Sequence, residues 1–156
     1  RQRLLMKLHH ILLFAHLAGV IAWVGGMAFA HFCLRPAALP LPPAQRLGLW
    51  SGVFRRFFPI VWLAIAVIVA SGFAMLFEVG FAQAPRSWHV MAAVGLVMSG
   101  IFASIWFGPW RLLQQAVAAE SWAQGAQALN LIRQRVTVNL VLGVLTVLLA
   151  TLGLAF

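Results

Sequence analysis

Apolar residues run along this chain in four long stretches, and shorter segments that contain most of the polar residues and prolines separate them. The stretches cover residues 8–34, 59–81, 88–110 and 136–156. Each is close to or longer than the roughly 20 residues that a helix needs to cross a bilayer. Apolar and polar residues do not alternate as they do in the strands of a membrane β-barrel. The pattern therefore predicts an all-α integral membrane protein, a four-helix bundle that forms a single transmembrane domain over residues 1–156.

The composition agrees with this interpretation. Of the 156 residues, 63% are hydrophobic and only 8% are charged, whereas soluble domains carry about 25% charged residues. A soluble fold of this size could not cover such an apolar interior with so little polar surface. The first stretch is too long for a signal-peptide core and no small-residue cleavage site follows it, so we expect it to be a retained span.

The segments between the spans also show patterns. Prolines interrupt RPAALPLPP (35–43), which is therefore not expected to form regular helix. Apolar residues then recur at helical spacing, which predicts a short amphipathic helix in the membrane interface between the first and second spans: Leu47, Trp50, Phe54 and Phe57. Between the third and fourth spans we expect helical extensions that turn near Gly125.

Small residues recur at four-residue steps in the third span. They form two rows that would let this helix approach its neighbours closely: Gly95, Ser99 and Ala103, and Gly100, Ser104 and Gly108. In the first span, the paired glycines Gly25 and Gly26 have two interpretations, close helix packing or room for a flat ligand.

The basic residues predict an orientation. Seven lie between spans one and two or between spans three and four: Arg35, Arg46, Arg55, Arg56, Arg111, Arg133 and Arg135. The opposite side has four: Arg1, Arg3, Lys7 and Arg86. The positive-inside rule then places both termini on the non-cytoplasmic side of a bacterial-type inner (plasma) membrane. We assign the net charge of +9 to topology and to the lipid bilayer, not to nucleic acid.

Histidines supply the candidate chemistry, and four of the five lie in or near the first span. His9, His16 and Trp23 are spaced by seven residues and so share one helix face within about 20°. His16 lies well inside the hydrocarbon, where fully charged residues cost about 2.5–3.5 kcal/mol, and a neutral ring still needs a partner for each nitrogen. It either bonds a polar group such as Ser71, Asn139 or a backbone carbonyl, or ligates a metal or haem.

A second histidine at a compatible depth favours a ligand role. His89 opens the third span, and under the predicted topology it lies near the same membrane face as His9 and His10. His9, His10, His16 and His89 are therefore the candidate metal ligands. Water near the interface offers an alternative partner to His9 and His10, and His31 lies near the inner end of the first span.

Two segments resemble a known family. HLAGVIAWVGG (16–26) resembles the first-span signature of the copper-resistance D (CopD) family, with a histidine, a tryptophan seven residues later and paired glycines. FRRFFPIVWLAIAVIVASG (54–72) is also similar to that family. HemJ-type protoporphyrinogen oxidases show a similar histidine-to-tryptophan spacing. The resemblance implies a four-helix bundle that binds haem b or handles copper.

One departure from the HemJ-type pattern weakens the implied oxidase activity. Those proteins have a histidine and a lysine at the start of the third span. Here SWHVM (87–91) retains His89 but has Met91 where the lysine is expected. A methionine thioether can ligate haem iron or Cu(I).

The first hypothesis is a haem b-binding membrane redox protein. It would transfer electrons to or from quinone or a partner subunit, or act as an oxidoreductase on a quinol or porphyrinogen-like substrate. His16 and either His89 or Met91 would be axial ligands, and other residues would complete the cofactor site: Trp23 packing on the ring, Gly25, Gly26 and Gly95 making room, and Arg86 at the propionates. Assembly into a homo-oligomer stays open.

The alternative is a copper-handling membrane permease. Its outer ligands would come from His9, His10, His89, Met6, Met91 and Met75, and its inner exit from His31 and Cys33. The two groups lie at opposite ends, as a path requires. Glu78, the only acid within a span, would pair with Arg86, hydrogen-bond a histidine or relay protons. No residue is assigned a catalytic role.

Overall fold

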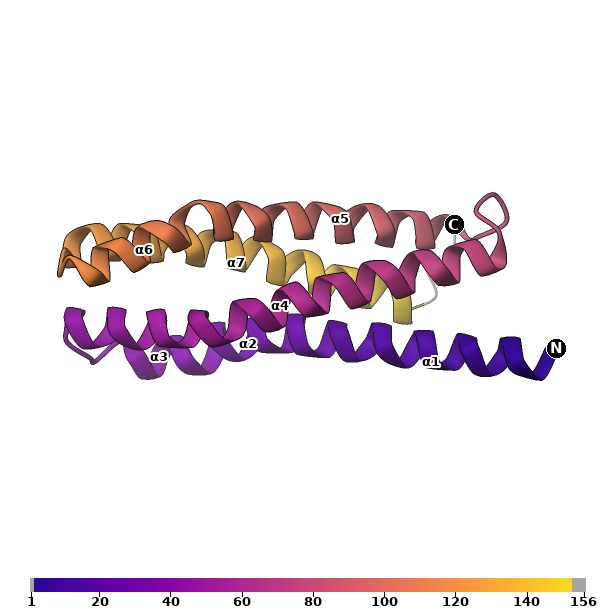
Figure 1. Cartoon of the computed structure of the whole chain (residues 1–156), viewed down its shortest axis with the longest axis horizontal. Helices are drawn as coiled ribbons and strands as arrows, with labels where there is room; N and C mark the ends of the chain where they lie inside the picture. Colours follow the sequence, from indigo (N-terminus) through magenta and orange to yellow (C-terminus); the bar gives the residue numbers. More distant parts are fainter. Residues whose placement is uncertain (1, 153–156) are drawn as a thin grey trace.

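The computed structural model describes residues 2–152, and it describes the side chains from Met6 onward. Within them the chain forms a bundle of four long helical segments without strands (Figure 1). Each segment is long and apolar enough to cross a membrane: Met6–Ala38, Pro43–Val79, Arg86–Ala118 and Trp122–Thr151. The predicted all-α membrane bundle is confirmed. Arg1 and the last residues of the predicted fourth span, 153–156, lie outside the described part.

The first segment is one helical path with two π-helical interruptions. It consists of α1 (Gln2–Val20), η1 (Ile21–Gly25), α2 (Gly26–Phe29), η2 (Ala30–Leu34) and α3 (Arg35–Ala38). A π-helical turn holds an extra residue and so rotates the helix faces that follow it. Because α3 extends to Ala38, helix continues into the segment that prolines were expected to break. The prediction of irregular structure was wrong for residues 35–38. Pro36 lies in the first turn of α3, where its missing N–H is tolerated.

The predicted amphipathic segment is the beginning of α4 (Pro43–Val79), which continues through Pro59 into the second span. In its apolar stripe Leu47, Trp50 and Phe54 are buried and Phe57 is partly buried, while Arg55 and Arg56 are exposed, so the amphipathic pattern is correct. The segment is not a separate helix in the membrane interface, because it is continuous with the second span. The stripe packs against other helices, since Phe54 contacts Trp110 with ring centroids 6.0 Å apart. A helix whose apolar face has a protein partner need not lie flat on lipid.

A short hairpin joins α4 to α5 (Arg86–Phe107). Gly80 ends α4 with φ of 95°, a left-handed conformation that glycine adopts without strain. The backbone N–H groups of Gln83 and Ala84 both donate to the Gly80 carbonyl. The tight turn makes α4 and α5 antiparallel neighbours.

The last two helices are α6 (Pro109–Ala118) and α7 (Trp122–Thr151). The chain turns between them at residues 119–121, so the predicted turn near Gly125 was a few residues too late. Gly125 instead lies within α7, where a Cβ atom would sit 2.9 Å from the Leu47 Cδ1 atom of α4. Its small size serves helix packing and not chain reversal.

The helices pack in an order that places α1 away from α5. α1 packs along α4, and α5 packs along α7. α4 also contacts α5 and α7, while η1 and α2 contact α7. α1 and α5 share no extensive contact, and Figure 1 shows α4 and α7 passing between them. Helix α1, which carries His16, therefore lies apart from α5, which carries His89 and Met91, although the first and third spans meet where the Trp23 and Phe102 ring centroids lie 6.4 Å apart.

An aromatic cluster forms the core near the α6 end of the bundle. Phe58 is 1% exposed and stacks on Phe54 with centroids 4.7 Å apart. The edges of Phe102 and Trp110 meet it at centroid distances of 5.3 Å each. Three helices, α4, α5 and α6, are joined through this one ring.

Of the predicted rows of small residues, Gly95 and Gly100 of α5 do not serve close helix approach. A Cβ atom at Gly95 or Gly100 would meet no atom within 4 Å, so neither glycine makes room for a neighbour. The buried face of α5 holds Met98, Phe102 and Ile105 instead. The glycines at tight helix contacts are Gly19, Gly26, Gly72, Gly125 and Gly143.

The helices are longer than a bilayer requires. α4 has 37 residues, about 56 Å at 1.5 Å per residue, against a hydrocarbon core of about 30 Å. Large apolar side chains such as Phe14 (74% exposed) and Ile21 (72% exposed) point outward from α1 and η1, as lipid contact requires. The bundle therefore reaches beyond the hydrocarbon, and the arginine-rich segments at its α3 and α6 end are suited to the headgroup region.

One interhelical hydrogen bond gives a modest stability prediction. Asn139 is 1% exposed, and its side-chain N–H donates to the Met98 carbonyl of α5 at 3.0 Å. We expect Asn139→Leu to lower the free energy of unfolding by about 0.6 kcal/mol, the average for such bonds between membrane helices. Unfolding by sodium dodecyl sulfate, followed by circular dichroism, measures it.

Thr137→Val is the matched control, because the Thr137 hydroxyl donates to the Arg133 carbonyl within α7. We expect no measurable loss from this variant. Equal losses at both positions would show that the bond between helices contributes nothing of its own.

Candidate functional site

His16 packs between α1 and α4 and is held there by a serine. Its Nδ1 lies 3.0 Å from the Ser71 hydroxyl oxygen. That hydroxyl donates to the Val67 carbonyl, so it is free to accept a hydrogen bond from His16 Nδ1–H. The neighbouring Gly72 makes room for the ring, since a Cβ there would sit 3.2 Å from His16 Cε1. Of the partners expected for His16, the structure places Ser71 beside it.

His9 has a similar contact about two turns nearer the chain start. Its Nδ1 lies 3.0 Å from the Glu78 carboxylate, with both side chains partly exposed. Of the roles expected for Glu78, the structure shows the bond to a histidine. In the described part of the chain, Glu78 forms no ion pair with Arg86.

These two contacts define one antiparallel seam between α1 and α4, which we call the histidine seam: His9, His16, Ser71, Met75 and Glu78. The histidines are seven residues apart on α1, and their partners are seven residues apart on α4 in the reverse direction. Met75 lies between these partners on the same face of α4 and is 8% exposed. Along α4, this buried thioether therefore lies at a level between those of the two imidazoles, which are about 10 Å apart along α1.

The remaining outer candidates lie near the same end of the bundle, and of these the His10 ring meets the His9 ring of the seam edge to face, with centroids 6.2 Å apart. His10 is exposed, and its Nδ1 contacts the Met6 carbonyl one turn earlier. The His89 ring meets the edge of Phe81, with centroids 4.6 Å apart, and Met91 is half-buried on α5. Within residues 6–152, no group of three or more histidine, cysteine or acidic side chains is arranged to hold a metal ion.

The residues predicted to surround haem b do not form a common pocket. His16 faces α4 (Ser71 and Gly72), and α1 does not pack on the α5 helix that carries His89 and Met91. The space beside Gly26 is filled by the Phe57 ring. Trp23 is 3% exposed and meets Phe102.

The other members of the predicted haem set are also dispersed. A Cβ atom at Gly25 or Gly95 would meet no other atom within 4 Å. Arg86 is exposed at the start of α5. The haem b hypothesis therefore gains no support from the part of the chain that the structure describes.

The predicted inner exit residues lie near the opposite end. Cys33 is an exposed free thiol, and His31 lines a cavity beside Arg35 and Arg133. Sequence reasoning missed this convergence, and it also missed Gly72. The signal for Gly72 was its position directly after Ser71, a predicted partner of His16.

Comparison with known proteins identifies the family. The family model for CopD, copper resistance protein D, matches residues 51–152, more than half of the chain. The matched part includes the α4 side of the histidine seam, with Ser71, Met75 and Glu78. No curated protein and no solved structure matches the chain. With four apolar helices and this match, the chain is a multi-pass membrane protein that belongs to the copper resistance protein D family.

Proposed function

We propose that this protein is a copper-handling permease and that the histidine seam is the outer part of its Cu(I) path. The observation that carries the proposal is the arrangement of the two seam histidines. Each has Nδ1 directed at an oxygen, that of Glu78 for His9 and that of Ser71 for His16. A ring whose Nδ1–H donates to such a partner keeps Nε2 as the lone-pair nitrogen, as in the second shells of metal-bound histidines.

The third donor supports copper over harder metals. Met75 and Leu76 are both buried between the two histidine contacts along α4, and of the two only Met75 offers a metal ligand: thioether sulfur selects Cu(I), while imidazole also binds copper well. Neutral ligands of this kind suit a metal in transit, because binding must be weak enough to allow release. Glu78, partly exposed at the outer end, adds a negative charge that attracts a cation to His9.

The direction of the path follows from the charge distribution. Seven of the eleven basic residues lie in the segments at the α3 and α6 end, which the positive-inside rule assigns to the cytoplasm. Copper would then enter near His9 on the non-cytoplasmic side and leave near His31 and Cys33. Both termini belong to the outer side under this proposal.

Copper uptake by liposomes that contain the full chain tests the proposal. Cu(I) is supplied outside, and a fluorescent Cu(I) indicator is trapped inside. We expect Met75→Leu and His16→Asn each to reduce the uptake rate at least about tenfold, equivalent to about 1.4 kcal/mol. Met27→Leu is the matched control, because Met27 is also buried but lies in α2, away from the seam. Uptake unchanged in Met75→Leu and His16→Asn would contradict the proposal.

An optical spectrum of the same purified protein separates copper handling from haem binding. We expect no Soret band after purification. A Soret band that His16→Ala removes and His31→Ala retains would overturn the copper assignment of His16 in favour of the haem hypothesis.

A further inference from the structure

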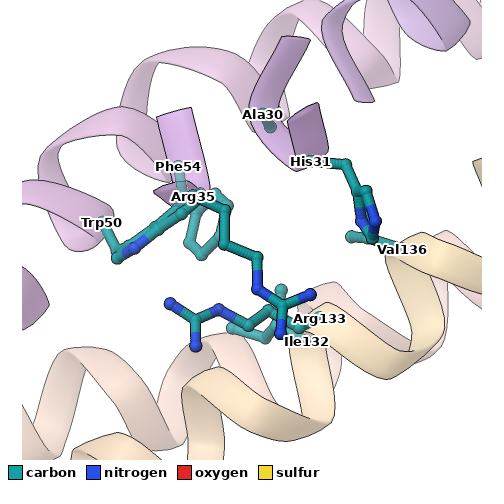
Figure 2. Close-up of a pocket in the computed structure, with 8 residues that line it drawn as sticks. All are labelled: Ala30, His31, Arg35, Trp50, Phe54, Ile132, Arg133 and Val136. Carbon is teal, nitrogen blue, oxygen red and sulfur yellow. The ribbon is translucent and has the colours of Figure 1, made fainter. Parts of the chain in front are cut away.

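The α3 and α6 end of the bundle contains a cavity whose buried polar atoms have no partner in the protein. Its lining includes His31 and Arg35 from the first segment, Trp50 from α4 and Arg133 from α7 (Figure 2). Arg133 Nε, Arg133 Nη2 and Trp50 Nε1 are buried and make no hydrogen bond. The three unpaired donors therefore belong to two side chains, on two helices, that line the same cavity. Buried donors without acceptors cost free energy, and native proteins rarely leave them unpaired.

The charge at this cavity is uncompensated. Figure 2 shows the Arg35 side chain reaching toward Arg133, and the positive charges of Arg35 and Arg46 both act on the Arg133 guanidinium. In the part of the chain that the structure describes, neither acid pairs with these arginines. Glu78 is bonded to His9 near the other end of the bundle, and Glu120 is exposed in the turn after α6.

Other contacts hold Arg133 in place without neutralising it. Its guanidinium carbon lies 5.4 Å from the centroid of the Trp50 ring, a cation–π contact that orients the planar group. His31 and Arg35 lie four residues apart, at and after the π-helical segment η2, and both side chains face the cavity. π-helical segments are common at functional sites because they redirect side chains. The arrangement holds its donors in place before any ligand arrives.

We propose that this cavity, defined by His31, Arg35, Trp50 and Arg133, binds a phosphate-bearing anion. The guanidinium fork matches the geometry of phosphate oxygens and can donate two parallel hydrogen bonds. The indole N–H adds a third donor. Basic pockets between membrane helices on the cytoplasmic side bind the headgroups of anionic lipids, and the arginine-rich segments here are suited to the headgroup region. A lipid headgroup and a free phosphate share this chemistry.

Binding to the purified full chain tests the site with two probes. In one arm the protein is placed in bilayer nanodiscs of phosphatidylcholine with or without phosphatidylglycerol. In the other, inorganic phosphate is added to the protein in a neutral detergent. Thermal unfolding reports stabilisation by a bound anion, and native mass spectrometry counts retained lipid. If phosphatidylglycerol alone stabilises the protein, the ligand is a lipid headgroup. If inorganic phosphate stabilises it as well, the site is also open to free phosphate. Either result supports the proposal.

Variants localise the effect. We expect Arg133→Gln and Arg35→Gln to weaken anion binding at least about tenfold. Arg55→Gln is the matched control, because Arg55 is exposed on α4 and does not line the cavity; we expect it to bind as the native protein does. Without anion, Arg133→Gln should be as stable as the native chain or more so, because it removes a partly buried charge whose Nε and Nη2 groups have no partner.

Three results would overturn the proposal. The first is no stabilisation of the native chain by either probe. The second is native affinity in Arg35→Gln. Arg35 is exposed, so this variant is expected to fold, and misfolding would not explain a loss of affinity in it. The third is an equal loss in Arg55→Gln, which would show diffuse attraction by the basic surface in place of a defined site.

Discussion

Replacing Phe58 with alanine is expected to lower the free energy of unfolding by about 3–5 kcal/mol, the range for removing a buried phenyl ring. Phe58 is 1% exposed and contacts the rings of Phe54, Phe102 and Trp110. Those rings come from three helices and cannot all move into the space. The loss is therefore one of dispersion contacts as well as of aromatic pairing.

Phe77→Ala is the matched control for this prediction. Phe77 lies on the same helix, α4, but is 67% exposed, where lipid replaces the lost contacts. We expect a change within about 0.5 kcal/mol, as for exposed substitutions elsewhere. The measurement is the midpoint and slope of unfolding by sodium dodecyl sulfate. Losses of similar size in the two variants would mean that the aromatic cluster does not hold the helices together.

Gly143→Val is expected to destabilise the bundle by about 1–3 kcal/mol, the usual cost of forcing extra atoms into a packed contact. A Cβ atom at Gly143 would sit 2.9 Å from Val24 Cγ2 and 3.3 Å from Met98 Cε. Methionine can move aside, but the χ1 angle of a β-branched valine is stiff. Helix α7 would have to shift away from η1, which carries Val24.

Gly100→Val is the corresponding control within a transmembrane helix. Gly100 also lies within a helix, α5, but a Cβ atom there would meet nothing within 4 Å. Removing a helical glycine should then be neutral or slightly stabilising, because glycine costs about 1 kcal/mol relative to alanine in a helix interior. The same unfolding assay decides the matter, and a Gly143→Val variant as stable as Gly100→Val would contradict the packing shown here.

The candidate site was predicted in part. The seven-residue spacing of His9 and His16 placed both on one face of the first span, and the structure shows both contacting α4. Ser71 was one of the partners expected for His16. The spacing could not indicate that the facing helix is α4, because periodicity describes one helix and contains no information about its neighbour. The expectation of a site shared with α5 arose from this gap.

The sequence by itself determined the class of the protein, its four spans and the buried stripe at the start of α4. These follow from side-chain hydropathy read along a helix, a local property that lipid and water enforce on each segment separately. Only the tertiary structure decided which glycines make close contacts, which helices are opposite each other and which arginines share a cavity. These depend on the shapes of helix surfaces that are distant in the chain. The π-helical segments also belong to this second group, because they rotate the faces that α2 and α3 present to the rest of the bundle.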